Sequence, residues 1–361
     1  MNTVLSARPV EQVNRRLIAE LSVEIFSTAP QSSEHQRNRF AANIATVARW
    51  SEEAGCTGIL IYSDNSLVDP WLVAQVVIAS TDRLSPLVAL QPIYMHPFSA
   101  AKMVASLSYI YGRRISLNLI AGGFRNDLLA LCDKTPHDQR YARLTEYMDV
   151  VRGLLSQNRP FNYCGQFYQV HNLVLQPALP AELSPRVLIS GSSEAGRRAA
   201  QSLGAVAVEY PEPSTCLQGC GARRDAGIRI GIIAADRADE AWRIADQRFP
   251  DDRAGQLRHL LAMRTSDSEW HRQLSMLSPD VQRDTEVYWL RPFHNYNTFC
   301  PYLVGSYDQV SGELAAYLAA GYRTFILDIP RDERDLHNAA EAFDLAAAKF
   351  LRQRQFEQSQ V

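Results

Sequence analysis

Residues 57–92 read TGILIYSDNSLVDPWLVAQVVIASTDRLSPLVALQP and contain two short apolar segments separated by a longer one. The apolar segments, residues 57–62 and 84–92, have the length of buried strands and are bounded by turn-forming residues. Pro70 opens the longer segment, as proline does at the first position of a helix. A strand, a helix and a second strand in this order predict two parallel strands joined by a helical crossover.

The same alternation runs through the rest of the chain. Further strands are expected at residues 21–26, 114–123, 185–191, 205–210, 227–235 and 322–330, with amphipathic helices after most of them. About eight such units over 361 residues favour a closed (β/α)8 TIM-like barrel, with residues 1–361 as a single domain. No GxGxxG motif follows the first strand, which disfavours a dinucleotide-binding fold.

Two segments interrupt the alternation. Residues 159–175 place two aromatic, strand-like runs around a Cys-Gly pair and predict a β-hairpin near residues 161–170. Residues 249–302 are polar with scattered aromatic side chains, and predict a long irregular insertion between units seven and eight. Such an insertion would lie over the C-terminal face of the barrel, where it could act as a lid.

Composition excludes several classes of protein. The net charge of −2 gives no electrostatic reason to expect a nucleic acid or an anionic membrane as a partner. The N-terminal residues do not resemble a signal peptide, and no apolar run approaches the ~20 residues that span a bilayer. We therefore expect a cytoplasmic protein with reduced cysteines. Cys216 and Cys220 form a CxxxC pair without a second pair at zinc spacing, so no metal site is predicted.

The turn at residues 188–200, LISGSSEAGRRAA, allows three interpretations. Ser192 or Ser193 could simply cap the following helix. Ser193 could be a nucleophile on a strand-to-helix turn, with Asp328 and His337 as later partners, although the second glycine of that motif is missing. Alternatively, Gly191 and both serines could hold a phosphate at the helix N-terminus, where free N–H groups and the helix dipole attract anions.

Other polar residues fall at barrel positions that could face a ligand. His137 and Tyr141 are four residues apart at the start of one helix and share a face. Asn118 lies inside an apolar strand, where a polar side chain needs a partner. Arg229 likewise lies on an apolar strand. It could face an anionic group of a ligand, or pair with a structural carboxylate such as Glu209.

The segments GCTGILIYSDNSLVDPWLVA, LVALQP, LNLIAGG, HDQRY, NYCGQFYQV, ISGSSEAG, ADEAW and LVGSYDQV occur in an order that resembles the bacterial luciferase-like flavin monooxygenases. In appearance the alkanesulfonate monooxygenase branch is nearest. The resemblance runs from about residue 23 to about residue 342. It rests on the ordered set of segments, because no single motif is specific.

The resemblance implies a barrel that binds reduced FMN supplied by a separate NAD(P)H-dependent flavin reductase. Dioxygen would be the co-substrate and would form a C4a-peroxyflavin that oxygenates a small organic molecule. It also implies a homodimer or homotetramer. By position, the cofactor-binding residues would be Asn118, Ala121, Gly122, His137, Tyr141, Gly191, Ser192 and Ser193.

Three positions depart from the sulfonate branch. Leu67 replaces a cysteine, Gly231 replaces a histidine two residues after Arg229, and Ile329 stands near a tyrosine position. The flavin site is therefore predicted to be kept, and the substrate to be bulkier and more apolar than a simple alkanesulfonate. Arg229 and His137 are the predicted catalytic residues. The predicted substrate pocket comprises Leu67, Gly231, Arg291, His294 and Tyr296.

Two alternatives use the same barrel. A deazaflavin (F420)-dependent oxidoreductase would transfer hydride without oxygen. A non-catalytic flavin-binding barrel would be consistent with the loss of three polar positions. Activity with reduced FMN in air, with F420 under argon, or with neither distinguishes the three.

Overall fold

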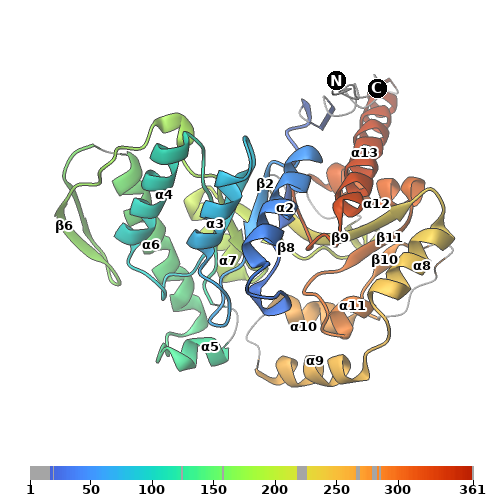
Figure 1. Ribbon diagram of the computed structural model, residues 1–361, viewed down its shortest axis with the longest axis horizontal. Helices are drawn as coiled ribbons and strands as arrows, with labels where there is room; N and C mark the ends of the chain where they lie inside the picture. Colours follow the sequence, from blue (N-terminus) through green and yellow to red (C-terminus); the bar gives the residue numbers. More distant parts are fainter. Residues whose placement is uncertain are drawn as a thin grey trace.

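Parallel pairing closes eight strands into a barrel in the computed structural model, which describes residues 17–18, 20–122, 125–156, 158–217, 226–265, 269–278, 283 and 286–359 (Figure 1). Each strand pairs with the next, β9 pairs back with β8 and with β12, and β12 pairs with β1. The predicted TIM-like barrel is thus confirmed. Its strands are β1 (Glu24–Thr28), β2 (Gly58–Ile61), β3 (Ser85–Leu90), β4 (Ser116–Leu119), β7 (Val187–Ser190), β8 (Val206–Glu209), β9 (Ala226–Ala235) and β12 (Thr324–Leu327).

Helices surround the barrel and connect most of its strands. These are α2 (Phe40–Glu53), α3 (Pro70–Ala79), α4 (Pro97–Tyr111), α5 (Arg125–Ala130), α6 (His137–Ser156), α7 (Glu194–Leu203), α8 (Ala238–Arg248), α12 (Tyr307–Ala320) and α13 (Glu333–Ser359). Short 3-10 turns follow β1 (Ser32–Glu34) and precede β7 (Ala181–Leu183). Between β8 and β9, the described residues contain only the 3-10 turn Ser214–Leu217. No helix in these described ranges is long and apolar enough to cross a membrane.

Two apolar layers stabilise the barrel. Inside it, Phe26, Leu60, Leu87, Leu188 and Ile326 pack together, each at most 2% exposed. Outside it, apolar side chains of the strands pack against the surrounding helices. Burying each such side chain contributes about 1.5–3 kcal/mol, so the closed barrel follows from strands that are apolar on both faces.

Local sequence signals fix where the helices begin. Asp69 Oδ1 accepts a hydrogen bond from the Trp71 N–H at 2.9 Å, and Pro70 occupies the first turn of α3. Ser306 and Gln309 form a reciprocal capping box at the start of α12. Such caps satisfy the free N–H groups of the first helical turn.

The predicted hairpin is confirmed. Strand β5 (Phe161–Cys164) pairs antiparallel with β6 (Gln169–Leu173), and the hairpin stands out from the body of the barrel beyond α6 (Figure 1). The Glu146 carboxylate of α6 accepts hydrogen bonds from the N–H groups of Gln166 (2.9 Å) and Phe167 (2.8 Å). The hairpin tip is therefore tied to α6.

The insertion is more regular than predicted. It contains α9 (Arg253–Thr265), α10 (Glu269–Met276), β10 (Tyr288–Trp289) and α11 (Arg291–His294), and α9 and α10 lie together at the lower edge of Figure 1. The strand β11 (Tyr302–Ser306) and helix α12 that follow were not predicted. Strand β9 is ten residues long, and its second half pairs with β11 from Gly231↔Tyr302 to Ala235↔Ser306. The extra length of β9 thus extends the sheet beyond the barrel.

Gly231 is required where β9 meets β11, because a Cβ there would lie 2.3 Å from the Tyr302 ring. Gly231→Ala should lower the free energy of unfolding by about 1–3 kcal/mol through overpacking. Urea unfolding followed by circular dichroism measures this. Gly312→Ala in α12 is the control. Its new Cβ would have Lys349 Nζ as nearest neighbour at 4.0 Å, so a gain of about 0.5–1 kcal/mol is expected. Wild-type stability of the Gly231 variant would contradict the tight packing.

Candidate functional site

A cavity of about 860 Å³ opens at the carboxyl ends of the barrel strands. Loops after β2, β3, β4 and β7 line it on one side, and the insertion lines it on the other. Parallel barrels bring loops from many strands to this one face, which is where such folds bind ligands. The predicted residues that line it are Leu67, Asn118, Ala121, Gly122, His137, Tyr141, Gly191, Ser192, Ser193, Arg229 and Tyr296.

The two serines of the β7–α7 turn have different environments. Ser193 caps α7, since its Oγ accepts a hydrogen bond from the Gly196 N–H at 3.2 Å. The Oγ of Ser192 is buried and has no hydrogen-bond partner among the described residues. A buried hydroxyl without a partner is costly, which indicates a ligand atom at this position. Helix capping therefore explains Ser193, whereas the hydroxyl of Ser192 is available to bind an anionic ligand.

Tyr141 of α6 packs against this turn. A Cβ on Gly191 would lie 2.4 Å from the Tyr141 hydroxyl oxygen, and the φ of +151° at Gly191 also disfavours any other residue. His137 lies one turn earlier on α6, with its ring centroid 5.2 Å from that of Tyr141. Its Nδ1 is 2.8 Å from Asp138 Oδ1. The turn and the start of α6 therefore form one polar corner of the cavity.

The neighbouring wall comes from β4. Asn118 is 3% exposed, and its Oδ1 accepts a hydrogen bond from Ser190 Oγ at 2.9 Å. This bond uses the amide oxygen of Asn118, which lines the cavity, so the donors of this side chain are on its NH₂ group. Ala121 and Gly122 continue the wall with small residues, which leaves room for a flat ring. The polar corner and this wall are adjacent parts of the cavity lining.

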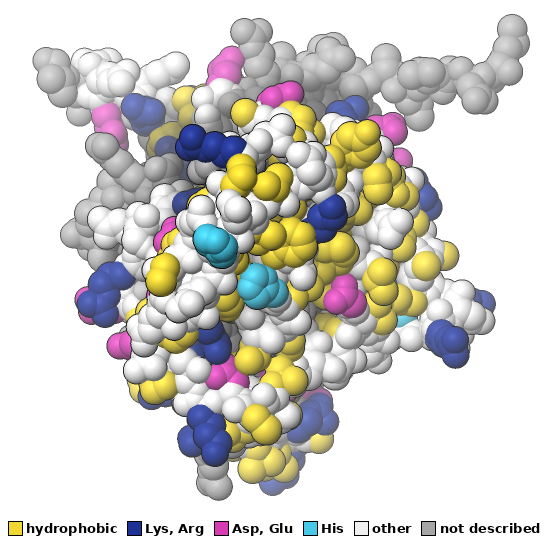
Figure 2. Space-filling view, turned by 90° about the vertical axis from the view of Figure 1, so that its left-hand side faces the viewer, with side chains coloured by type: hydrophobic (Ala, Val, Ile, Leu, Met, Phe, Trp, Pro, Cys, Tyr) yellow, Lys and Arg dark blue, Asp and Glu magenta, His cyan; other side chains and the backbone are white. Residues whose placement is uncertain are grey.

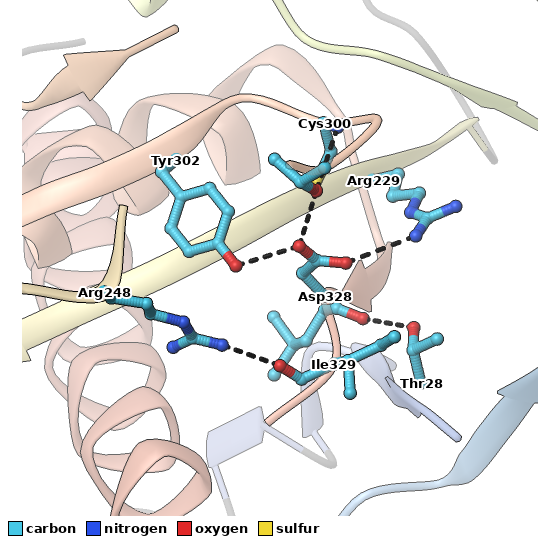
Figure 3. A network of polar contacts seen from close by, with 9 residues as sticks. Thr28, Arg229, Arg248, Cys300, Tyr302, Asp328 and Ile329 are labelled. Carbon is cyan, nitrogen blue, oxygen red and sulfur yellow. Dashed lines mark hydrogen bonds and ion pairs between the residues drawn. The ribbon is translucent and has the colours of Figure 1, made fainter. Parts of the chain in front are cut away.

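Arg229 reaches the cavity from β9, and its carboxylate partner is Asp328. The Nη2 of Arg229 donates to Asp328 Oδ1 at 3.3 Å (Figure 3). Its guanidinium carbon lies 4.8 Å from the centre of the Tyr62 ring. Glu209, the partner suggested from sequence, instead accepts a hydrogen bond from the Tyr322 hydroxyl at 2.6 Å. The prediction of Glu209 as the partner of Arg229 was wrong, because Asp328 follows β12, the strand that pairs with β9 next to Arg229.

Asp328 also excludes the nucleophile interpretation of the turn. Its carboxylate accepts hydrogen bonds from Thr298 Oγ1 (2.5 Å) and the Tyr302 hydroxyl (2.8 Å) in addition to Arg229. The hydrogen bonds of the Asp328 carboxylate to described residues are thus with Arg229, Thr298 and Tyr302, and not with His337 of α13. Ser193 Oγ is used in the helix cap. The three side chains of a catalytic triad are therefore not assembled here.

Three residues of the predicted substrate pocket do not line the cavity. Gly231 contacts the Tyr302 ring, so the missing histidine does not enlarge the pocket as expected. Arg291 Nη1 lies 3.9 Å from Asp246 and 3.7 Å from Asp251 on the outer side of the insertion. His294 contacts the Leu277 carbonyl at 3.2 Å. These errors arose because β11 and the helices of the insertion could not be placed from sequence.

A sequence profile described as luciferase-like monooxygenase matches residues 21–214, more than half of the chain. The chain belongs to the luciferase-like monooxygenase family. This confirms the resemblance to the luciferase-like flavin monooxygenases and makes the protein a flavin-dependent monooxygenase, whereas the match does not single out the alkanesulfonate branch.

One curated relative of this luciferase-like monooxygenase is the 4-(gamma-L-glutamylamino)butanoyl-[BtrI acyl-carrier protein] monooxygenase BtrO of Niallia circulans. It is 34% identical over 330 residues, covering 88% of this chain and 96% of the relative. Two solved structures show the same fold. The oxygenating constituent of 3,6-diketocamphane monooxygenase from Pseudomonas putida, with FMN, has a TM-score of 0.65, 15% identity and coverage of 90% and 97%. An F420-dependent secondary alcohol dehydrogenase has a TM-score of 0.61, 14% identity and coverage of 90% and 99%.

The cavity of this luciferase-like monooxygenase also has polar residues that sequence analysis missed. Asp64 and Asp127 line it on the side of the β2 and β4 loops. Burial raises the pKa of Asp127, and the negative charge of Asp64 adds to this. The Tyr94 hydroxyl donates to Asn65 Oδ1 at 2.6 Å. Asp64 lies in the loop after β2 and Asp127 in the short helix α5, so the periodicity of the barrel strands gave no signal for either.

The described part of this chain holds no group of three histidine, cysteine or acidic side chains placed to bind a metal ion. Cys216 is an exposed free thiol. Cys220 of the CxxxC pair lies outside the described residues.

The insertion covers the cavity of the luciferase-like barrel with a cluster of aromatic and imidazole rings. His259 of α9 and His271 of α10 are 3% and 1% exposed, with ring centroids 5.3 Å apart, and both pack on Phe293. His271 and Tyr296 line the cavity. Burial lowers the pKa of His259 and of His271 to about 4, and the positive charge of a second histidine adds to the shift at each.

The histidine cluster should make stability depend on pH. In the unfolded chain both histidines titrate near 6.5, so between pH 6.5 and 4 the unfolded state binds more protons and folding weakens as pH falls. From pH 7.5 to 5.0 we expect a loss of up to about 2 kcal/mol per histidine. Urea unfolding at the two pH values measures it. His259→Gln, which cannot titrate, should remove about half of the dependence. An equal dependence in both proteins would contradict this assignment.

Proposed function

We propose that the protein is the oxygenating component of a two-component system, and uses reduced FMN and dioxygen to oxygenate an organic substrate that is not a simple alkanesulfonate. The single observation that carries the cofactor proposal is the buried, unpartnered Ser192 hydroxyl beside Gly191 and Tyr141. The FMN complex of the 3,6-diketocamphane enzyme supports FMN as the flavin on this fold. When bound, the reduced flavin supplies the electrons that activate oxygen.

The residues of the cavity would then have distinct tasks. Ser192, Ser193 and the α7 N-terminus would hold the phosphate, and Tyr141 would close the corner beside it. Asn118 would donate to the flavin ring from β4. His137, ordered by Asp138, would hold or release a proton at its ring nitrogens. The ring cluster of the insertion would exclude water, which reactive oxygen chemistry requires.

The substrate proposal rests on the curated relative. The name of this enzyme describes an amide-containing acyl group on an acyl-carrier protein, and the two chains align over 96% of the relative. We infer that this protein also oxygenates an acyl chain that carries carbonyl groups. Leu67 and Tyr296 on the cavity wall provide apolar contact for such a chain, and Arg229 provides a donor. The F420-dependent neighbour keeps hydride transfer as a second candidate, on fold alone.

Partners and assembly form part of the same proposal. The reduced flavin would come from an NAD(P)H-dependent flavin reductase in the cytoplasm. Apolar side chains run across the middle of the face over α4, α6 and the hairpin (Figure 2). Tyr109 and Ile110 at the end of α4 are 73% and 64% exposed. Exposed apolar surface of this kind supports a homodimer or homotetramer.

The phosphate assignment can be tested by comparing FMN with riboflavin, which lacks the phosphate. Ser192→Ala with Ser193→Ala should weaken FMN binding about tenfold or more, because charge-assisted hydrogen bonds contribute about 1.5–3 kcal/mol each. Riboflavin binding should change little. Fluorescence titration measures both. Ser202→Ala on α7, whose hydroxyl bonds to Ala199 O, is the control. Equal weakening for FMN and riboflavin would reduce the turn to a helix cap.

The reaction can be tested with the purified protein, an added FMN reductase and NADH in air. We expect one oxygen atom to be added to a γ-glutamylaminobutanoyl thioester, detected by mass spectrometry with ¹⁸O₂. We expect no sulfite from short alkanesulfonates. Efficient sulfite release would refute the substrate proposal. Turnover with F420 under argon would instead support the dehydrogenase, and tight flavin binding without oxidation of any substrate would support a non-catalytic barrel.

A further inference from the structure

The guanidinium of Arg229 is nearly enclosed at the wall of the cavity. Its side chain is 8% exposed, and its Nε is buried with no hydrogen-bond partner among the residues described. The Tyr62 ring lies 4.8 Å from the guanidinium carbon. A cation in such a place requires a counter-charge, from the protein or from a ligand.

Asp328 provides that counter-charge from within the protein. Its side chain is 12% exposed and is held by Arg229, Thr298 and Tyr302 (Figure 3). Burial raises the pKa of Asp328, but Arg229 and the two hydroxyl donors outweigh burial and hold the pKa below its ordinary value. The carboxylate is therefore ionised at neutral pH, and the Arg229–Asp328 pair has no net charge.

The hydrogen bonds of Arg248, whose charge also acts on Asp328, are made to other groups. The Nη1 of Arg248, on α8, lies 2.7 Å from Asp335 Oδ2. Its Nη2 donates a hydrogen bond to the Ile329 carbonyl at 2.7 Å (Figure 3). The charge of Arg248 also stabilises the Asp328 carboxylate, but Arg248 is itself paired with Asp335, and the ion pair of Asp328 is with Arg229. Among the described residues that line the cavity, the remaining charged side chains are Arg125, Asp64 and Asp127. The cavity therefore has no excess of positive charge.

We propose that Asp328 is a specificity-determining residue, which cancels the charge of Arg229 so that the cavity accepts a neutral carbonyl oxygen rather than an anionic head group. An unpaired arginine in a dry site favours a carboxylate or sulfonate, which supplies the missing charge. With Asp328 in place, an anion would meet a paired guanidinium and a nearby carboxylate. A neutral amide or thioester carbonyl can accept the free N–H without adding charge. The inference deepens the proposed function, and rests on it for the identity of the substrate.

The decisive measurement is binding of two probes, pentane-1-sulfonate and hexanamide, by calorimetry with the full chain. Asp328→Asn should bind the sulfonate at least tenfold more tightly than wild type, and hexanamide within about threefold. Asp308→Asn is the matched control. It changes the net charge equally but removes an exposed carboxylate paired with Lys349, 2.7 Å away. This control should bind both probes as wild type does.

Two further variants keep the test decisive. Arg229→Gln combined with Asp328→Asn removes both charges and should abolish the gain in sulfonate binding. If Asp328→Asn fails to fold, Arg229→Gln alone should bind hexylammonium at least tenfold more tightly, because Asp328 then lacks its partner. Equal sulfonate affinity of folded Asp328→Asn and wild type would overturn the inference. So would a gain that survives in the double variant. Since these are binding measurements, they stand whether or not oxygenation is observed.

Discussion

Parallel pairing of β9 with both β8 and β12 is the constraint on which the rest of the structure depends. It closes the barrel, and therefore directs the carboxyl ends of all eight strands to one rim. Residues as distant in the sequence as Asn118, Ser192 and Arg229 line one cavity only because their strands end at this rim. Without closure, the same side chains would be spread along the edge of an open sheet.

Charge at the cavity is balanced locally rather than by the whole protein. The net charge of −2 says nothing about the site, whereas individual contacts do. Arg229 lines the cavity and is paired with Asp328, while the other charged side chains of the described lining are Arg125, Asp64 and Asp127. The cavity is thus polar without being strongly charged. This is the setting in which hydrogen-bond geometry, rather than long-range attraction, determines which substrate binds.

Much of the polar corner and of the β4 wall could be predicted from sequence as cavity lining, and most of the predicted substrate pocket could not. Asn118, Tyr141 and Ser192 lie at or just beyond strands and helix starts, and both periodicity and capping signals locate these. Gly231 and His294 were misplaced because their surroundings depend on β11, whose five residues follow an insertion without a regular pattern. Asp328 was visible as an acid after a strand, but its partners come from elements that only the folded chain brings together.

Strand β9 connects the barrel to the segment that follows the insertion. One half of this strand belongs to the barrel and carries Arg229, while the other half is hydrogen-bonded to β11, at the end of the insertion. Hydrogen bonds between β9 and β11 therefore fix the C-terminal end of the insertion to the wall of the cavity. On the other side of the insertion, α9 and α10 are joined by the ring contact of His259 with His271 and by a hydrogen bond of 3.0 Å between His259 Nε2 and Ser275 Oγ. The strand that carries Arg229 therefore also fixes the end of the insertion that covers the cavity.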